Sequence, residues 1–517
     1  MKAKYMFMAF SAILVMPVAA QETYENAKVI TEDLNGTARY VGMGGATDAL
    51  GADISTISTN PAGIGLFRHN KVEATAGMVT QQDAAKYSGG DATNLSFDQI
   101  GVVLTTKGSN GSFLNFAFNF HKSKNFDYIL SADSKLNNAS QNKLSYMKLY
   151  NGLLYAQGED GTFYEKEPFV TCNQLDDIYF RNLFYAAGDG LAYYYDAEGY
   201  DFDRAHSGYV GEYDFNISGN IHDRVYLGFT LGLHDVHYLH KGDYTETMMP
   251  NPEDIKTLNV YDERRIKGTG VSLKFGATVR PIEYSPLLIG VNISSPVYYD
   301  LKSSNYTEVS DGNYTAYAEE AYEYKVYTPW KFGANLGYTV GNYLALGASY
   351  EFSDFSRTDA RVNEGDRYYY DYHDTSNSDE YMNRNTKNTL KGVSTIKVGA
   401  EFKPMPEMAI RAGYNYVSPM YEKDGFKDGT IPSYGTYYAS ATDYTNWEST
   451  NRLTFGMGWR WGQVNLDLAY QYSMTSGKFT PFMNYRDSEY EDFDIITNEV
   501  KVNNKRHQIL CTLGYTF

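Results

Sequence analysis

Hydrophobicity alternates with a period of two through most of this chain, and this pattern restricts those parts to β-strands. Between Val464 and Met474, for example, every second residue is apolar or tyrosine, and the residues between them are polar or small. Successive side chains of a strand point to opposite faces, so each such segment has one apolar face and one polar or small face. About fourteen such segments begin near residues 71, 96, 113, 208, 224, 263, 286, 322, 343, 391, 407, 446, 463 and 500. Each is close to the ~10 residues that a tilted strand needs to cross a membrane.

Short and long connections alternate between these segments. The short ones include residues 340–342 and 403–406, and the long ones are residues 81–95, 123–207, 241–262, 300–317, 354–390, 418–445 and 475–499. Bacterial outer-membrane barrels have short periplasmic turns and long outer loops, whereas a soluble sandwich has no reason to place every long loop at one end. We therefore predict an all-β fold, a transmembrane antiparallel β-barrel of about fourteen strands over residues 71–517. It would lie in the outer membrane with both termini on the periplasmic side.

Residues 1–20 are predicted to be a secretory signal peptide. Lys2 and Lys4 precede an apolar run, and Val18-Ala19-Ala20 supplies small residues before a cut at Gln21. The apolar run is too short for a transmembrane helix, which needs about 20 residues. The signal peptide agrees with an exported protein.

Composition excludes nucleic acid as a partner and supports a membrane setting. The net charge is −18, so the chain cannot bind nucleic acid by counterion release. The 50 tyrosines suit a membrane–water interface, where the ring is in contact with lipid and the hydroxyl with water. Outer-membrane lipid is therefore an expected partner. Cys172, in an expected loop, and Cys511, on an expected strand, make no disulfide framework.

Residues 21–70 lack the alternation and are rich in Gly, Ala, Thr and Asp. A barrel of about fourteen strands is too wide for its wall side chains to fill, because about eight strands already enclose only a packed or ligand-sized interior. Without a closure the cell would leak. We predict that residues 21–70 fold back into the lumen as a hatch, or plug. The alternative is an extension into the periplasm.

The expected hatch contains a rigid turn at Asn60-Pro61-Ala62. Pro61 fixes its own φ and biases Asn60 away from the helical region. Gly63 permits a left-handed turn, and Gly44 and Gly45 are further expected turns. As local chemistry, the motif predicts only a stiff bend in the chain.

The wider context of this motif resembles a known family. The run from Thr37-Ala38-Arg39 through Gly45-Ala46, Ala49 and Asp53 to Asn60-Pro61-Ala62 is similar to the N-terminal hatch of the FadL family. That family comprises outer-membrane transporters of long-chain fatty acids and includes channels for aromatic hydrocarbons. The resemblance implies a barrel of the strand number counted above, whose hatch motif, here Asn60, Pro61 and Ala62, rearranges to open a passage. It implies passive uptake of hydrophobic small molecules, without a cofactor.

Two features depart from the family pattern. Family members carry apolar outer loops after the fifth and seventh strands, whereas the longest loop here follows the third expected strand. In the family a lateral exit lies at a kink in the third strand, but residues 113–122 contain neither Gly nor Pro. Passage could therefore be lateral or straight through the lumen.

The last segment, Ile509 to Phe517, alternates and ends on an aromatic residue. This ending resembles the terminal strand that the barrel assembly machinery recognises, so we expect that machinery as a partner. A soluble edge strand could also end in this way.

Two other functions are weighed against transport. One is a surface receptor for haem, for which His234, His237 and His240 are weak candidate ligands. Their odd spacing puts neighbours on opposite faces of a strand, so they can converge only if the strand has ended. The other is a lipid hydrolase. No Gly-x-Ser-x-Gly, His-Glu-x-x-His or phosphate-binding glycine loop occurs, so we predict a protein without enzymatic activity and without a bound metal or cofactor.

Overall fold

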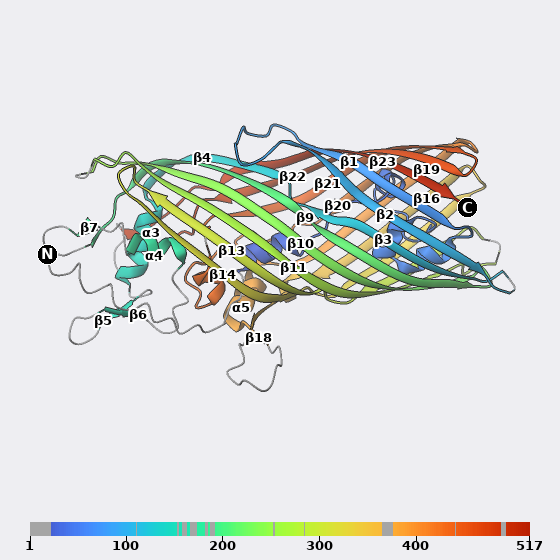
Figure 1. Ribbon diagram of the computed structural model, residues 1–517, viewed down its shortest axis with the longest axis horizontal. Coiled ribbons are helices and arrows are strands. Elements are labelled where there is room, and N and C mark those ends of the chain that lie inside the picture. Colours follow the sequence, from blue (N-terminus) through green and yellow to red (C-terminus); the bar gives the residue numbers. More distant parts are fainter. Residues whose placement is uncertain are drawn as a thin grey trace.

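The computed structural model describes residues 22–517 except 110, 152–154, 158–162, 166–172, 181–184, 187–191, 252–253, 284, 364–375, 440 and 487–492. Over these residues the chain forms one closed antiparallel barrel of fourteen wall strands, as predicted (Figure 1). The first strand pairs with the last and closes the wall. Among the described residues, no helix has the length and apolar character needed to span a membrane. The expected signal peptide and Cys172 lie outside the described residues.

The wall closes on itself, and four of its strands consist of two pieces. In chain order it comprises β1 (Lys71–Gln81), β2 (Thr93–Lys107), β3 (Phe113–Asn125) with β4 (Tyr128–Ala139), β9 (Ala197–Ile221), β10 (Val225–Met248), β11 (Thr257–Val279), β12 (Leu288–Ser294) with β13 (Tyr298–Ser310), β14 (Thr315–Tyr327) with β15 (Lys331–Val340), β16 (Leu344–Asp354) with β17 (Asp359–Asn363), β19 (Gly392–Met405), β20 (Met408–Val417), β21 (Tyr444–Trp461), β22 (Val464–Thr480) and β23 (Val500–Thr516). Each expected segment coincides with one wall strand.

Helices and short strands occupy the lumen and the loops. Inside the barrel are α1 (Thr23–Val29), α2 (Ala38–Gly42) and the 3₁₀ helices η2 (Ile54–Ser58) and η3 (Pro61–Leu66). The long connections carry α3 (Gln141–Tyr150), β5 (Tyr155–Gln157), β6 (Phe163–Glu165), α4 (Gln174–Ile178), β7 (Tyr185–Ala186), β8 (Ala192–Tyr193), η5 (Phe355–Arg357), β18 (Ser376–Ser378), α5 (Glu380–Thr389) and α6 (Tyr434–Tyr437). In Figure 1 the loop helices α3 and α4 lie at the end of the barrel opposite the C-terminus.

An apolar belt covers the outer face of the barrel on the side of the short turns. On β10 the exposed side chains of this belt include Leu227, Phe229 and Leu233. Further along the same strand, the outward positions become polar, as at Lys241 and Asp243. An apolar outer band flanked by polar surface is the signature of a membrane-spanning barrel. The wall therefore projects well beyond the membrane on the side of the long loops.

Two of the expected loops are in fact strands. Residues 241–262 were expected to form a loop, but β10 continues to Met248 and β11 begins at Thr257. Likewise, most of residues 300–317 belongs to β13 and β14. Both regions lie in the part of the wall that projects beyond the belt. There the outer face contacts water, so the alternation that predicted the other strands is lost.

The third wall strand is interrupted just after the stretch that lacked Gly and Pro. Pairing between β2 and β3 ends at Gln99 and His121, and β4 pairs with β9 but not with β2. At the interruption the side chain of Asn125 accepts a hydrogen bond of 2.8 Å from the backbone N–H of Asp127. Such local side-chain bonds compete with the strand ladder. The sequence therefore breaks this strand with an Asn–Asp turn and without Gly or Pro.

Residues 22–70, here called the lumenal segment, run inside the barrel along much of its length. The C-terminal Phe517 lies at the short-turn end, as expected (Figure 1). Tyr24 of α1 instead donates a hydrogen bond of 2.7 Å to Asn446 on β21, and Thr23 contacts Thr386 of the loop helix α5. Helix α1 therefore lies in the half of the lumen nearer the long loops.

Candidate functional site

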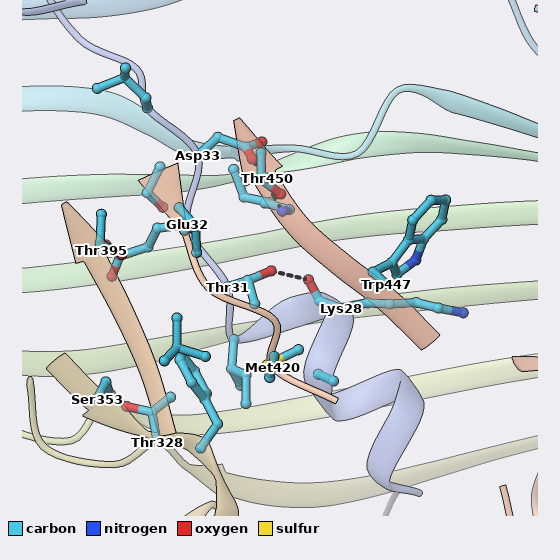
Figure 2. A pocket seen from close by; sticks show the side chains of 18 of the residues that line it. Lys28, Thr31, Glu32, Asp33, Thr328, Ser353, Thr395, Met420, Trp447 and Thr450 are labelled. Atoms are coloured by element: carbon cyan, nitrogen blue, oxygen red, sulfur yellow. Dashed lines mark hydrogen bonds and ion pairs between the residues drawn. The ribbon is translucent and has the colours of Figure 1, made fainter. Parts of the chain in front are cut away.

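A cavity of about 380 Å³ lies between the lumenal segment and the wall, on the loop side of α2. Figure 2 shows Lys28 and Thr31 at the end of α1, followed by Glu32 and Asp33, with wall side chains such as Thr450 around them. Apolar side chains also line it, including Ile30, Phe126, Val297, Phe352, Met420 and Trp447. The lining is therefore amphipathic.

Three cationic side chains of the wall surround Asp33 at this cavity. Its carboxylate lies 3.3 Å from Lys124 Nζ, 3.6 Å from an Arg452 nitrogen and 3.9 Å from an Arg506 nitrogen. It also accepts a 3.1 Å hydrogen bond from the backbone N–H of Asn125. Burial acts to raise the pKa of Asp33, but the three cations outweigh it and hold that pKa at about 2. The carboxylate of Asp33 carries one negative charge and the three basic side chains carry one positive charge each. These four groups therefore have a net charge of about +2.

Other acidic residues of the lumenal segment also pair with basic side chains of the barrel. Glu32 lies 2.6 Å from Lys331, and Glu25 lies 3.4 Å from Arg264. Burial acts to raise the pKa of Glu25, but Lys28 and Arg264 bring it well below its ordinary value. Acidic side chains of the segment thus pair with basic side chains of the wall at several levels of the barrel.

Four lumen-facing glycines, here called the glycine row, lie side by side on neighbouring wall strands. The register pairs Gly337 of β15 with Gly347 of β16, Gly347 with Gly399 of β19, and Gly399 with Gly413 of β20. The lumenal backbone lies directly against them: a Cβ on any of the last three would overlap backbone atoms of residues 43–46. The missing side chains let the plug pack against the wall without a gap at this level.

The Asn60-Pro61-Ala62 motif lies against a second group of wall glycines. A Cβ at Gly228 would overlap Pro61, and one at Gly290 would lie 2.8 Å from Asn60 Nδ2. Asn60 is fully buried; its side-chain NH₂ donates to the carbonyl oxygen of Asp48 at 3.2 Å and to Thr278 Oγ1 of β11 at 3.1 Å. Its Oδ1 accepts from the Ala62 N–H at 3.2 Å and so caps η3. This one side chain ties the motif to another part of the plug and to the wall.

The three glycines expected at turns play different roles. Gly44 and Gly45 have φ of +65° and +79°, the left-handed region that favours glycine. Gly63 is part of η3 and does not have a positive φ, so the expected left-handed turn there is wrong. A Cβ at Gly63 would overlap Thr56, so the position requires glycine for close packing between η2 and η3.

The candidate haem ligands do not share a site. His234 and His240 face the lumen, whereas His237 is on the outer face, paired at 2.9 Å with Asp235. His240 is engaged through both ring nitrogens, at 2.5 Å with Asp262 and 3.0 Å with Tyr238. Because the strand continues to Met248, the three side chains cannot converge on one ion.

Sequence reasoning missed the charged lining of the cavity. Lys124, Arg452 and Arg506 come from β3, β21 and β23, and nothing in their spacing along the chain relates them. The sequence pattern that could have predicted them is a basic residue at an inward-facing position of a barrel strand. Only the closed register shows that such residues meet Asp33.

The closed wall, the apolar outer belt and the internal plug define a plugged outer-membrane β-barrel.

No family model matches the chain, and no curated protein matches it. Solved structures similar to it include the toluene transporter TbuX of Ralstonia pickettii (TM-score 0.49, 9% identity, covering 94% of this chain and 99% of that one). A FadL homologue of Pseudomonas aeruginosa gives a TM-score of 0.48 and 12% identity over 97% and 99% of the two chains. The toluene transporter TodX of Pseudomonas putida gives 0.46 and 10% over 94% and 99%. Similarity at this level does not assign a function.

Proposed function

We propose that this protein is an outer-membrane channel for the passive uptake of hydrophobic compounds such as long-chain fatty acids, gated by its N-terminal hatch. The observation that carries this proposal is the amphipathic cavity between plug and wall. Its volume of about 380 Å³ is within the ~300–1,000 Å³ of small-molecule pockets. Burial of an acyl chain contributes about 0.8 kcal/mol per CH₂, enough to retain a ligand without a covalent step. The resemblance of residues 37–66 to the FadL hatch supports the same function.

The cationic cluster suggests how ligand binding is coupled to the hatch. A ligand carboxylate would compete with Asp33 for Lys124, Arg452 and Arg506, which carry more positive charge than Asp33 neutralises. Its binding would release the chain at Asp33 from the wall. The freed segment would then shift along its length as far as the Asn60-Pro61-Ala62 motif. Rearrangement of that motif would open the passage.

Binding of a long-chain fatty acid to the purified barrel, with hemin as competitor, tests this function. We expect saturable binding that hemin does not displace. Replacing both Arg452 and Arg506 by Gln should weaken binding of the acid but not of the corresponding fatty alcohol. Arg460→Gln is the matched control, because Arg460 is on the same strand but exposed. Tight hemin binding without fatty-acid binding would instead indicate that the protein is a haem receptor.

The outer surface and the last strand each suggest a partner. The outer belt contacts outer-membrane lipid, and β23 is the strand that the assembly machinery would recognise. β23 completes the wall by pairing with both β22 and β1, and Phe517 remains half-exposed at its end. Deleting Phe517 should lower the amount of folded barrel in cells without changing the properties of the barrel that does form.

A further inference from the structure

Side chains that bind metals lie side by side on three neighbouring wall strands. The register places His121 of β3 opposite Glu212 of β9, and Glu212 opposite His234 of β10. Asp214 follows two residues along β9, on the same inward face. Opposite residues of an antiparallel pair have Cβ atoms about 4.5–5.5 Å apart. The register alone therefore brings two imidazoles and two carboxylates together.

The distances among these groups suit a shared ion. Glu212 Oε2 lies 3.8 Å from His121 Nε2 and 3.9 Å from His234 Nδ1, and His121 Nδ1 lies 3.8 Å from Asp214 Oδ2. One ligand atom from each of His121, Glu212 and Asp214 can be chosen so that all lie within 4.8 Å of one another. Ligand atoms about 2.0–2.2 Å from a common Zn²⁺ are at most about 4.4 Å apart. His234 is close to Glu212 but does not lie within 4.8 Å of all three, so it would complete the ligand set by a rotation of its side chain.

Burial and charge both favour a cation at this place. All four residues are buried, and three of their atoms, Nδ1 of His121, Nδ1 of His234 and Oδ2 of Asp214, have no hydrogen-bond partner among the described residues. Buried polar atoms without partners are rare in native proteins and call for an explanation. A bound metal ion would satisfy them.

In this structure, the positive charge at the cluster comes from Lys274 of β11. Its ammonium pairs with Glu212, and with Asp214 at 3.3 Å. It reaches them across Gly232, where a Cβ would lie 3.2 Å from Asp214 Oδ1. The single ammonium of Lys274 therefore faces two buried carboxyl groups. A divalent cation could replace the ammonium.

We propose that His121, Glu212, Asp214 and His234 form a binding site for a divalent transition-metal cation of the Zn²⁺ class. Imidazole together with carboxylate is a ligand set that suits Zn²⁺ and neighbouring transition metals. His121, Glu212 and His234 line the cavity, so an ion can reach them from it. Lys274 lines the cavity too, and its side chain turns toward the open space when the metal binds.

Calorimetric titration of the chelator-treated full chain in detergent with Zn²⁺ tests the site. We expect one Zn²⁺ per chain, with affinity lowered at least tenfold by His121→Gln and by His234→Gln. Lys274→Gln should raise the affinity, because it removes the competing cation. His237→Gln is the matched control, since His237 is on the same strand as His234 but on the outer face. Co²⁺ titration should give the visible absorption of a site with nitrogen and oxygen ligands.

The outcomes separate this site from a purely structural ion pair. No Zn²⁺ binding by the unaltered chain, or binding that only His237→Gln abolishes, overturns the proposal. A Lys274→Gln chain that binds Zn²⁺ no more tightly than the unaltered chain also contradicts it. Retained heat-modifiable migration on gels shows that each variant barrel is folded, and the two histidine variants test the site independently.

Discussion

Gly347 on the wall and Ala46 in the plug are in direct backbone contact: a Cβ on Gly347 would overlap the carbonyl oxygen of Ala46. The same holds for the neighbouring members of the glycine row, which face Met43 and Gly44. Atoms this close leave no space for water between wall and plug. On these strands the close packing of the lumenal segment against the wall therefore depends on positions that carry no side chain.

Gly347→Ala should leave the barrel folded but prevent the plug from seating. Alanine is compatible with a strand, so the ladder survives, while its methyl group would push the backbone at Ala46 out of place. We expect a raised leak of small solutes from liposomes that contain the variant. Gly108→Ala is the control, because a Cβ there meets nothing closer than 3.4 Å. Equal, low leak in both variants would contradict the tight packing described here.

Asn60→Asp should raise the population of the open hatch. Aspartate keeps the acceptor that caps η3, but it cannot donate to Asp48 and Thr278. Leaving such buried partners unpaired costs about 1–3 kcal/mol, and each ~1.4 kcal/mol is tenfold in an equilibrium. Single-channel recording should show openings roughly ten times more frequent. Thr278→Val removes only one of the two hydrogen bonds and should raise the frequency of openings less. If Thr278→Val raises that frequency as much as Asn60→Asp or more, this role of Asn60 is contradicted.

Asp33→Asn should tighten the binding of a fatty acid severalfold. The variant removes the carboxylate that competes for Lys124, Arg452 and Arg506. Binding of the fatty alcohol should change little, because it carries no charge. Asp91→Asn, at an exposed loop position, is the control. Weaker acid binding by the Asp33 variant would show that the cations do not receive the ligand.

The contribution of Asp33 to the seating of the lumenal segment should be insensitive to pH until strongly acidic conditions. The pKa of Asp33 is lowered to about 2 from about 3.9 in an unfolded chain. Its contribution to stability is therefore complete above about pH 4 and is lost as the pH falls toward 2. Channel conductance in planar bilayers should show an acid-induced rise below pH 4 that Asp33→Asn lacks. A difference between the two chains that arises between pH 5 and 8 would contradict this assignment.

The alternation in the sequence predicted the wall because lipid requires an apolar outer face. It predicted every wall strand within the belt and failed where strands project into water, as at Lys241 and Asp243 of β10. Tyrosine was expected at the membrane interface, and Tyr338 and Tyr515 are indeed exposed on wall strands, but Tyr200, Tyr244 and Tyr324 are buried in the lumen. Tyrosine content alone does not distinguish a lipid interface from a wet interior with apolar walls.

The residues of the candidate sites could be predicted only in part. The hatch motif at Asn60 is local in the sequence and so was visible there. The glycine row, the cluster around Asp33 and the group at Glu212 each join residues from several strands. Their assembly depends on the register between strands, which hydrophobic alternation does not determine beyond its period of two.

The permeability of liposomes that contain the chain without residues 21–70 tests the central claim most directly. The wall strands begin at Lys71, so the shortened chain should still form a barrel, which its gel mobility can verify. The account predicts a large rise in the nonspecific leak of small polar solutes and the loss of any dependence on fatty acid. An unchanged permeability of a folded, shortened barrel would show that the lumenal segment is not the gate.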